Sequence, residues 1–128
     1  MNCKDLMIGD WVKVEEPTET VKARVLGVHK DGVINYEVFY SCVRATGQIH
    51  TDYVSPIPIT EEILEKNGFK KVNMTVDGDY RHYHLHGVCI SWEEQNGFWY
   101  GEGDIEFKYV HELQHLLRLC GIEKEIEL

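Results

Sequence analysis

The stretch that decides the fold is Asp5-Leu6-Met7-Ile8-Gly9-Asp10-Trp11-Val12-Lys13-Val14. Gly-Asp is a turn signal, and the alternation of apolar and polar residues after it predicts a first strand. Further strands are predicted, with turns at Lys30-Asp31-Gly32 and Ala45-Thr46-Gly47, over residues 21–29, 33–40, 48–51 and 53–59. The last is an edge strand, where proline is tolerated. Short strands so closely spaced favour a small closed barrel, because closure removes the exposed edges of a sheet.

This part of the chain resembles SH3-like barrels. The resemblance covers residues 5–59 and rests on the opening Leu6-Met7-Ile8-Gly9-Asp10-Trp11-Val12 and the exit Tyr53-Val54-Ser55-Pro56-Ile57. It implies an architecture that usually serves as an adaptor for proteins or nucleic acids, and it implies no particular chemistry.

The second half predicts a small α+β unit. Thr60 is a suitable N-cap for a helix over residues 61–67, which Gly68 ends. Strands are predicted over 70–76, 81–92 and 98–107, with turns at Asp77-Gly78-Asp79 and Asn96-Gly97 and a bulge at Gly87. A helix over 109–120 follows, and a terminal strand is possible after it. The predicted fold is therefore a β-rich α+β protein, with an SH3-like small barrel at 1–58 and, at 59–128, an antiparallel sheet with two short helices.

Charge and composition limit the partners. The 128 residues carry a net charge of −9. Residues 1–59 hold 6 basic and 8 acidic groups (−2), whereas residues 60–128 hold 7 and 14 (−7). Such a chain repels phosphate, so nucleic acid is an unlikely partner. No signal peptide or long apolar run is visible, which predicts a cytoplasmic protein without a membrane segment. The scattered cysteines predict reduced thiols, at Cys3, Cys42, Cys89 and Cys120.

The C-terminal helix carries a catalytic-looking motif, His111-Glu112-Leu113-Gln114-His115, which spells H-E-x-x-H. On a helix this spacing lets His111 and His115 share a zinc ion, with Glu112 as general base. A helical projection, however, sets both imidazoles opposite the apolar arc, so they are expected to face the solvent. The metzincin continuation is also missing, because Arg118 and Gly121 stand where glycine and histidine would be required. The interpretation preferred here is a chance spelling on a polar helix face.

The strand over 81–92 offers a second metal hypothesis. Period-two geometry puts His82, His84 and His86 on one face, from which His84 could supply a third zinc ligand to the helix. The alternative is that Tyr83 and Leu85 face the core, while the histidines lie on an outward polar face that needs no ligand. No cofactor is expected, with zinc as the alternative.

Three consecutive aromatics, Phe98, Trp99 and Tyr100, cannot all be buried on one face. At least one is expected to be exposed and to contact a protein partner or ligand. The alternative is that it packs against the barrel.

Nearly the whole chain resembles short uncharacterised proteins of anaerobic gut bacteria and of their phages or mobile elements. The shared features are the Gly9-Asp10-Trp11-Val12 start, the run from Ile57-Pro58-Ile59-Thr60 to Asn67-Gly68-Phe69, and the pattern Y-V-H-x-L-Q at residues 109–114. In that group the later histidine is often asparagine, which breaks H-E-x-x-H and counts against a zinc role for Glu112 and His115. The resemblance implies no activity.

Together these features predict a non-catalytic interaction module of a bacterial or phage accessory system, acting on a protein partner or by self-association. The alternative is a minimal zinc hydrolase with Glu112 as base. A third hypothesis is a small-ligand sponge, which no phosphate loop or basic cluster supports.

Overall fold

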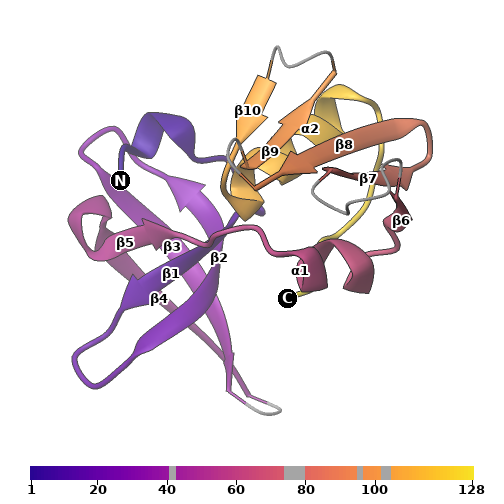
Figure 1. Cartoon of the computed structure of the whole chain (residues 1–128). Helices are drawn as coiled ribbons and strands as arrows, with labels where there is room; N and C mark the ends of the chain where they lie inside the picture. Colours follow the sequence, from indigo (N-terminus) through magenta and orange to yellow (C-terminus); the bar gives the residue numbers. More distant parts are fainter. Residues whose placement is uncertain (41–42, 74–79, 95–96, 102–104) are drawn as a thin grey trace. The chain divides into compact units, whose positions relative to one another are not determined.

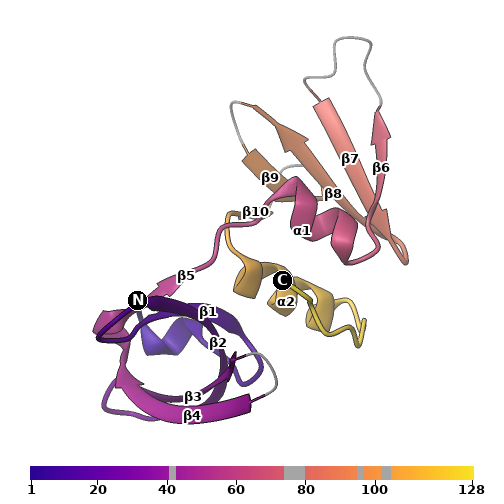
Figure 2. The ribbon, with the colours of Figure 1, turned by 90° about the horizontal axis from the view of Figure 1, so that it is seen from below.

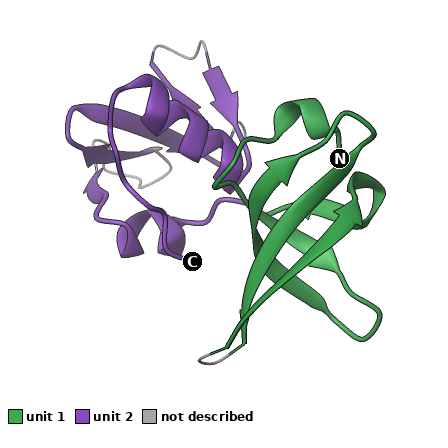
Figure 3. Ribbon diagram, turned by 180° about the vertical axis from the view of Figure 1, so that it is seen from behind, with its two compact units in different colours: residues 1–57 green, residues 58–128 purple. Residues whose placement is uncertain are grey.

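The computed structural model describes residues 1–40, 43–73, 80–94, 97–101 and 105–128. Cys42, the turn at Asp77-Gly78-Asp79, the strand residues 74–76 and the Asn96 half of the Asn-Gly turn lie outside the described residues. The chain divides into two compact units, Met1–Ile57 and Pro58–Leu128 (Figure 3). Within the described ranges, neither α-helix is long and apolar enough to cross a bilayer.

The first unit is a five-stranded antiparallel sheet in the order β4-β3-β2-β1-β5, in which β1 to β4 form a meander and β5 returns to pair with β1 (Figure 1). Its elements are η1 (Cys3–Asp5), β1 (Trp11–Glu15), β2 (Thr20–Val28), β3 (Val33–Tyr40), β4 (Val43–His50), η2 (Thr51–Tyr53) and β5 (Val54–Pro56). The sheet is strongly curled (Figure 2). Among the described residues, β4 and β5 each pair with one neighbour only, so the ladders form an open sheet and not the predicted closed barrel.

Alternating residues of these strands build the core of the first unit. The buried apolar side chains are Leu6, Val12, Val14, Ala23, Val25, Ile34, Val38 and Val54. They recur with the period of two that the sequence pattern predicts for half-buried strands. The turn before β1 is fixed by Asp10, whose Oδ2 accepts a hydrogen bond of 2.8 Å from the Met7 N–H.

One predicted turn of the first unit is wrong. Ala45-Thr46-Gly47 lies inside β4, which continues from Val43 to His50. Gly47 is needed there for close approach and not for a turn, because a Cβ on it would lie 2.9 Å from the hydroxyl oxygen of Tyr36 on β3. The same glycine signal therefore has a cross-strand cause that the local sequence does not reveal.

The second unit is an antiparallel sheet in the order β10-β9-β8-β7-β6 with two α-helices. Its elements are α1 (Glu61–Lys66), β6 (Lys70–Asn73), β7 (Tyr80–Leu85), β8 (Val88–Glu93), β9 (Gly97–Tyr100), β10 (Ile105–Phe107) and α2 (Val110–Leu119). Both helices match their prediction. Thr60 Oγ1 caps α1 by accepting from the Ile63 N–H at 3.2 Å.

The three predicted strands of this unit are in fact five. The expected bulge at Gly87 is a two-residue hairpin turn: His86 and Gly87 have φ values of 45° and 84°, and Leu85 pairs with Val88. Two successive positive φ values are typical of the turns that join adjacent antiparallel strands. The chain therefore reverses after His86 where the sequence pattern predicts one continuous strand.

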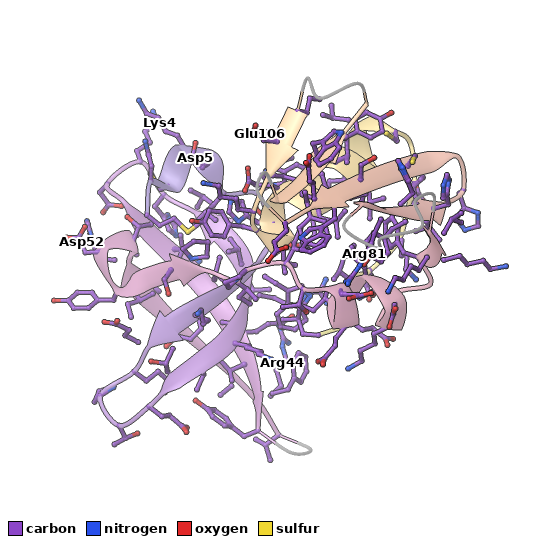
Figure 4. The ribbon with its side chains drawn as sticks, in the orientation of Figure 1. Lys4, Asp5, Arg44, Asp52, Arg81 and Glu106 are labelled. Atoms are coloured by element: carbon purple, nitrogen blue, oxygen red, sulfur yellow. The ribbon has the colours of Figure 1, made fainter. Side chains whose placement is uncertain are left out.

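The two faces of this sheet differ in their neighbours. One cross-strand row runs Lys71, Tyr83, Ile90, Tyr100 and Ile105, and the contacts of both helices lie on this face. Glu61 of α1 binds Lys71 Nζ at 2.6 Å and Arg81 at 2.8 Å, and Cys120 after α2 lies 3.9 Å from the Tyr100 hydroxyl. Arg81 is labelled in Figure 4. The opposite face carries His82, His84, Cys89 and Ser91.

The C-terminal tail does not form the strand that its alternating residues suggested. Residues 122–128 have no regular secondary structure. The side-chain amide of Asn67, which is 1% exposed, hydrogen-bonds both backbone groups of Glu127. Its Nδ2 donates to the Glu127 carbonyl at 2.8 Å, and its Oδ1 accepts from the Glu127 N–H at 2.7 Å. These bonds hold the tail against the end of α1 and bury Ile126.

Candidate functional site

The two histidines of H-E-x-x-H differ in their surroundings. His111 is only 6% exposed, so the expectation that both imidazoles face the solvent is wrong for this residue, whereas His115 is half-buried. The His111 ring stacks on Tyr109 with centroids 5.9 Å apart and meets the His115 ring edge-on at 5.7 Å. The helical projection gave the wrong expectation for His111 because the buried surface of α2 is wider than its apolar arc and also includes Gln114.

Glu112 is used as a helix cap. Its Oε1 accepts hydrogen bonds of 3.1 Å from the backbone N–H groups of both Lys108 and Tyr109. A glutamate in the first turn that returns to the N-cap backbone is the reciprocal half of a capping box. This capping contact gives Glu112 a structural role that requires no metal-bound water.

The strand histidines His82 and His84 lie on the face of the sheet opposite to the one that the end of α2 contacts. His82 and His84 are on the face of the sheet opposite Tyr100, whereas His86 is an exposed turn residue. The inward positions of Tyr83 and Leu85 agree with the alternative in which the histidines occupy an outward face. Across the described ranges, no group of three or more His, Cys, Asp or Glu side chains is arranged to hold a metal ion.

The aromatic run of β9 is half-buried throughout. Phe98 packs among core rings, with centroids 6.2 Å from those of both Tyr83 and Phe107. Trp99 lies on the other face, opposite Ser91.

A pocket in the first unit combines acidic and apolar side chains. It has a volume of about 420 Å³ and is lined by Glu15, Glu16, Pro17, Ile49 and Tyr53. The elements that form it are the end of β1 with the loop after it, the end of β4, and η2. Tyr53 is 55% exposed, so its ring is available to a ligand.

Tyrosines also surround the carboxylate of Glu16. The Tyr40 hydroxyl donates to Glu16 Oε1 at 2.7 Å, and this hydrogen bond is the main reason that the pKa of Tyr40 is raised to about 12. Burial, and then the charge of Glu16, raise the pKa of Tyr36. The adjacent carboxylates of Glu15 and Glu16 make this corner of the unit more favourable for a cation than for an anion.

Comparisons with protein-family models, with curated proteins and with solved structures found no match for this chain. Its function must therefore be argued from its own residues.

A second pocket, of about 480 Å³, lies at the end of α2. Its lining consists of Gln114, Arg118, Gly121, Ile122, Glu123, Lys124 and Glu125. The charges of both signs favour neither an anionic nor a cationic ligand, and no aromatic ring contributes. The pocket of the first unit has the more selective chemistry.

Sequence reasoning missed the pocket of the first unit. Residues 15–19 read only as a polar loop, and Tyr53 only as part of the strand exit. The adjacent Glu15-Glu16-Pro17 was a usable signal, but its meeting with Ile49 and Tyr53 depends on contacts between residues more than thirty positions apart.

Proposed function

We propose that this protein is a non-catalytic binding module, whose first unit takes a positively charged segment of a protein partner at the pocket lined by Glu16 and Tyr53. The observation that carries the proposal is an open, mainly apolar hollow with an exposed tyrosine ring and a proline, bordered by the two acidic residues Glu15 and Glu16. Aromatic faces attract Arg and Lys side chains, and carboxylates complement their charge.

The charge of the whole chain supports a basic partner. A net charge of −9 attracts cationic surfaces over long distances and accelerates their encounter. The same charge repels nucleic acid, which argues against the other usual partner of small β-rich adaptors.

Exposed apolar residues supply additional contact area in the first unit. Large apolar side chains that are more than a third exposed include Met7, Ile8, Val28, Phe39, Tyr40, Val43 and Tyr53. One cation–π contact at an exposed site contributes only about 0.5–1 kcal/mol, so a useful affinity requires neighbouring contacts of this kind.

The sequence resemblances agree with this role. The SH3-like pattern of residues 5–59 favours an adaptor that binds other proteins. The resemblance to short proteins of gut bacteria and their phages favours an accessory system as its setting, with the partner drawn from the same host or element.

The proposal is tested with a fluorescent peptide of consecutive arginines, compared with a peptide of consecutive glutamates. The arginine peptide is expected to shift the backbone amide NMR signals around the pocket, whereas the glutamate peptide leaves them unchanged. Tyr53→Ala should raise the dissociation constant, measured by fluorescence anisotropy, about two- to fivefold, and Glu16→Gln should also raise it.

Phe39→Ala is the matched control, because Phe39 is 56% exposed, close to the 55% of Tyr53, and does not line the pocket. It should raise the dissociation constant less than Tyr53→Ala does, because Phe39 contributes at most peripheral contact area. Equal effects of the Phe39 and Tyr53 substitutions, or amide shifts centred on the second unit, would show nonspecific attraction to an acidic protein and overturn the proposal.

A further inference from the structure

Cys89 lies between two imidazoles on the outward face of the second sheet. Its Sγ is 3.7 Å from His82 Nδ1 and 3.7 Å from His84 Nε2. Strand register produces this cluster, because Cys89 pairs directly with His84 and His82 is the diagonal neighbour. The Ser91 hydroxyl, 3.0 Å from His82 Nδ1, holds the second ring in place.

The cluster is accessible within its unit. Cys89 is half-buried and His84 is exposed. The contacts of α1 and α2 lie on the other face of the sheet, with Lys71, Arg81 and Tyr100. A small molecule can therefore approach the thiol from this side of the unit without displacing either helix.

The chemistry of the cluster is that of an activated thiol. Thiolates, and not thiols, act as nucleophiles, and reactive cysteines are typically half-exposed and beside histidine or another basic group. His84 Nε2 is positioned to accept the Cys89 proton, whereas His82 Nδ1 is engaged by the Ser91 hydroxyl and lines the other side of the thiol. We infer that Cys89 is a reactive thiol that undergoes thiol–disulfide exchange with small disulfides, with His84 as proton acceptor and His82 as a positioning residue.

The exchange balances without a further reactant. Cys89 Sγ attacks one sulfur of the disulfide, its S–H proton passes to an imidazole, and a new S–S bond forms as the original one breaks. The leaving thiolate then takes the proton from the imidazole. The Cys89 sulfur is oxidised to a mixed disulfide, and the leaving sulfur is reduced to a free thiol.

Charges of both signs border the thiol. The row that contains His84 and Cys89 continues to the exposed Lys70 on β6. The parallel row runs from Val72 through His82, Ser91 and Trp99 to Glu106 on β10, so its carboxylate lies at the far edge of the sheet. Glu93 lies on the same face, two residues beyond Ser91 on β8, so Lys70 is the cation that an anionic probe can use beside the thiol.

Two single-cysteine proteins test the inference. In one only Cys89 is kept, and in the other only Cys120, with serine at the remaining cysteine positions. Cys120 is the matched control, because it is exposed and its described partner is the Tyr100 hydroxyl at 3.9 Å, not an imidazole. The probe is dithiobis(nitrobenzoate), an anionic disulfide whose released thiolate is followed by absorbance at neutral pH.

The Cys89 protein is expected to react about tenfold faster than the Cys120 protein, although its thiol is less exposed, because a neighbouring imidazole can take the thiol proton as the sulfur attacks. His82→Asn with His84→Asn should remove this difference and leave the Cys120 rate unchanged. Equal or slower reaction of Cys89, or a histidine effect that is the same in both proteins, would overturn the inference. Far-ultraviolet circular dichroism checks that the substituted sheet is folded, and Lys70→Ala in the Cys89 protein should slow only the anionic probe and not neutral iodoacetamide.

Discussion

Replacement of Asn67 by alanine should release the C-terminal tail from α1. Asn67 Nδ2 donates to the carbonyls of Ile63 at 2.7 Å and Glu127 at 2.8 Å, and its Oδ1 accepts from the Glu127 N–H at 2.7 Å. All three bonds are part-buried, and the Asn67 side chain is 1% exposed. No other residue type supplies both a donor pair and an acceptor in this position except the longer glutamine.

The loss in the free energy of unfolding can be worked out from these three hydrogen bonds. A neutral hydrogen bond contributes about 0.5–1.5 kcal/mol to stability, so the three bonds together are worth about 1.5–4.5 kcal/mol. Two of them reach the tail, and these two account for about 1–3 kcal/mol of the total. In a chain that lacks residues 126–128, Asn67→Ala should therefore cost only the remaining 0.5–1.5 kcal/mol or so.

Urea denaturation measures this difference in the free energy of unfolding. Tryptophan fluorescence reports the second unit alone once Trp11 of the first unit is replaced by phenylalanine, because the other tryptophans, Trp92 and Trp99, lie in the second unit. The four proteins needed are the full-length and shortened chains, each with Asn67 or alanine, all in the Trp11→Phe background. They form a double-mutant cycle, in which the coupling energy isolates the bonds to the tail.

The reasoning fails if Asn67→Ala destabilises the shortened chain as much as the full-length chain. It also fails if the substitution leaves the full-length midpoint unchanged. Either result would mean that the amide does not anchor the tail in solution.

Two further predictions concern charged groups of the second unit. The pKa of Glu61 is lowered from 4.5, chiefly by the hydrogen bond from Lys71, so its contribution to stability is present above the unfolded pKa and lost as the pH falls through the lower folded value. The stability difference between the natural protein and Glu61→Gln should therefore shrink between about pH 6 and about pH 3, measured by urea denaturation at each pH, and a constant difference would contradict the ion pair. Glu112→Ala should cost about 0.5–2 kcal/mol because the first turn of α2 loses its cap, whereas Glu112→Gln keeps the acceptor oxygen and costs less. Elemental analysis of protein purified without an affinity tag should be made in parallel: about one zinc per chain that His115→Ala removes would favour the hydrolase hypothesis over the capping role.

The local elements of the fold could be predicted because their causes are local. Alternation identified most strands of the first unit, Thr60 and Gly68 set the ends of α1, and Gly121, with a φ of 74°, ends α2. Two of the errors arose because a glycine can serve a turn, a bulge or a close approach between strands. Gly47 was interpreted as a turn and Gly87 as a bulge, although the first lies under Tyr36 and the second completes a hairpin.

The candidate sites were less predictable, because they depend on register and long-range packing. Had His86-Gly87 been interpreted as a two-residue turn, antiparallel pairing would have placed Cys89 opposite His84 from sequence alone. No such signal exists for the burial of His111.

The sequence by itself determined an acidic, β-rich α+β chain and both helices, since alternation, helix caps and charge are properties of neighbouring residues. Only the tertiary structure decided that Glu16 and Tyr53 share one pocket, that Asn67 anchors the tail, and that a thiol meets two imidazoles. These contacts join residues that are distant along the chain. They form only when strand pairing and core packing, whose energies are summed over the whole fold, bring those residues together.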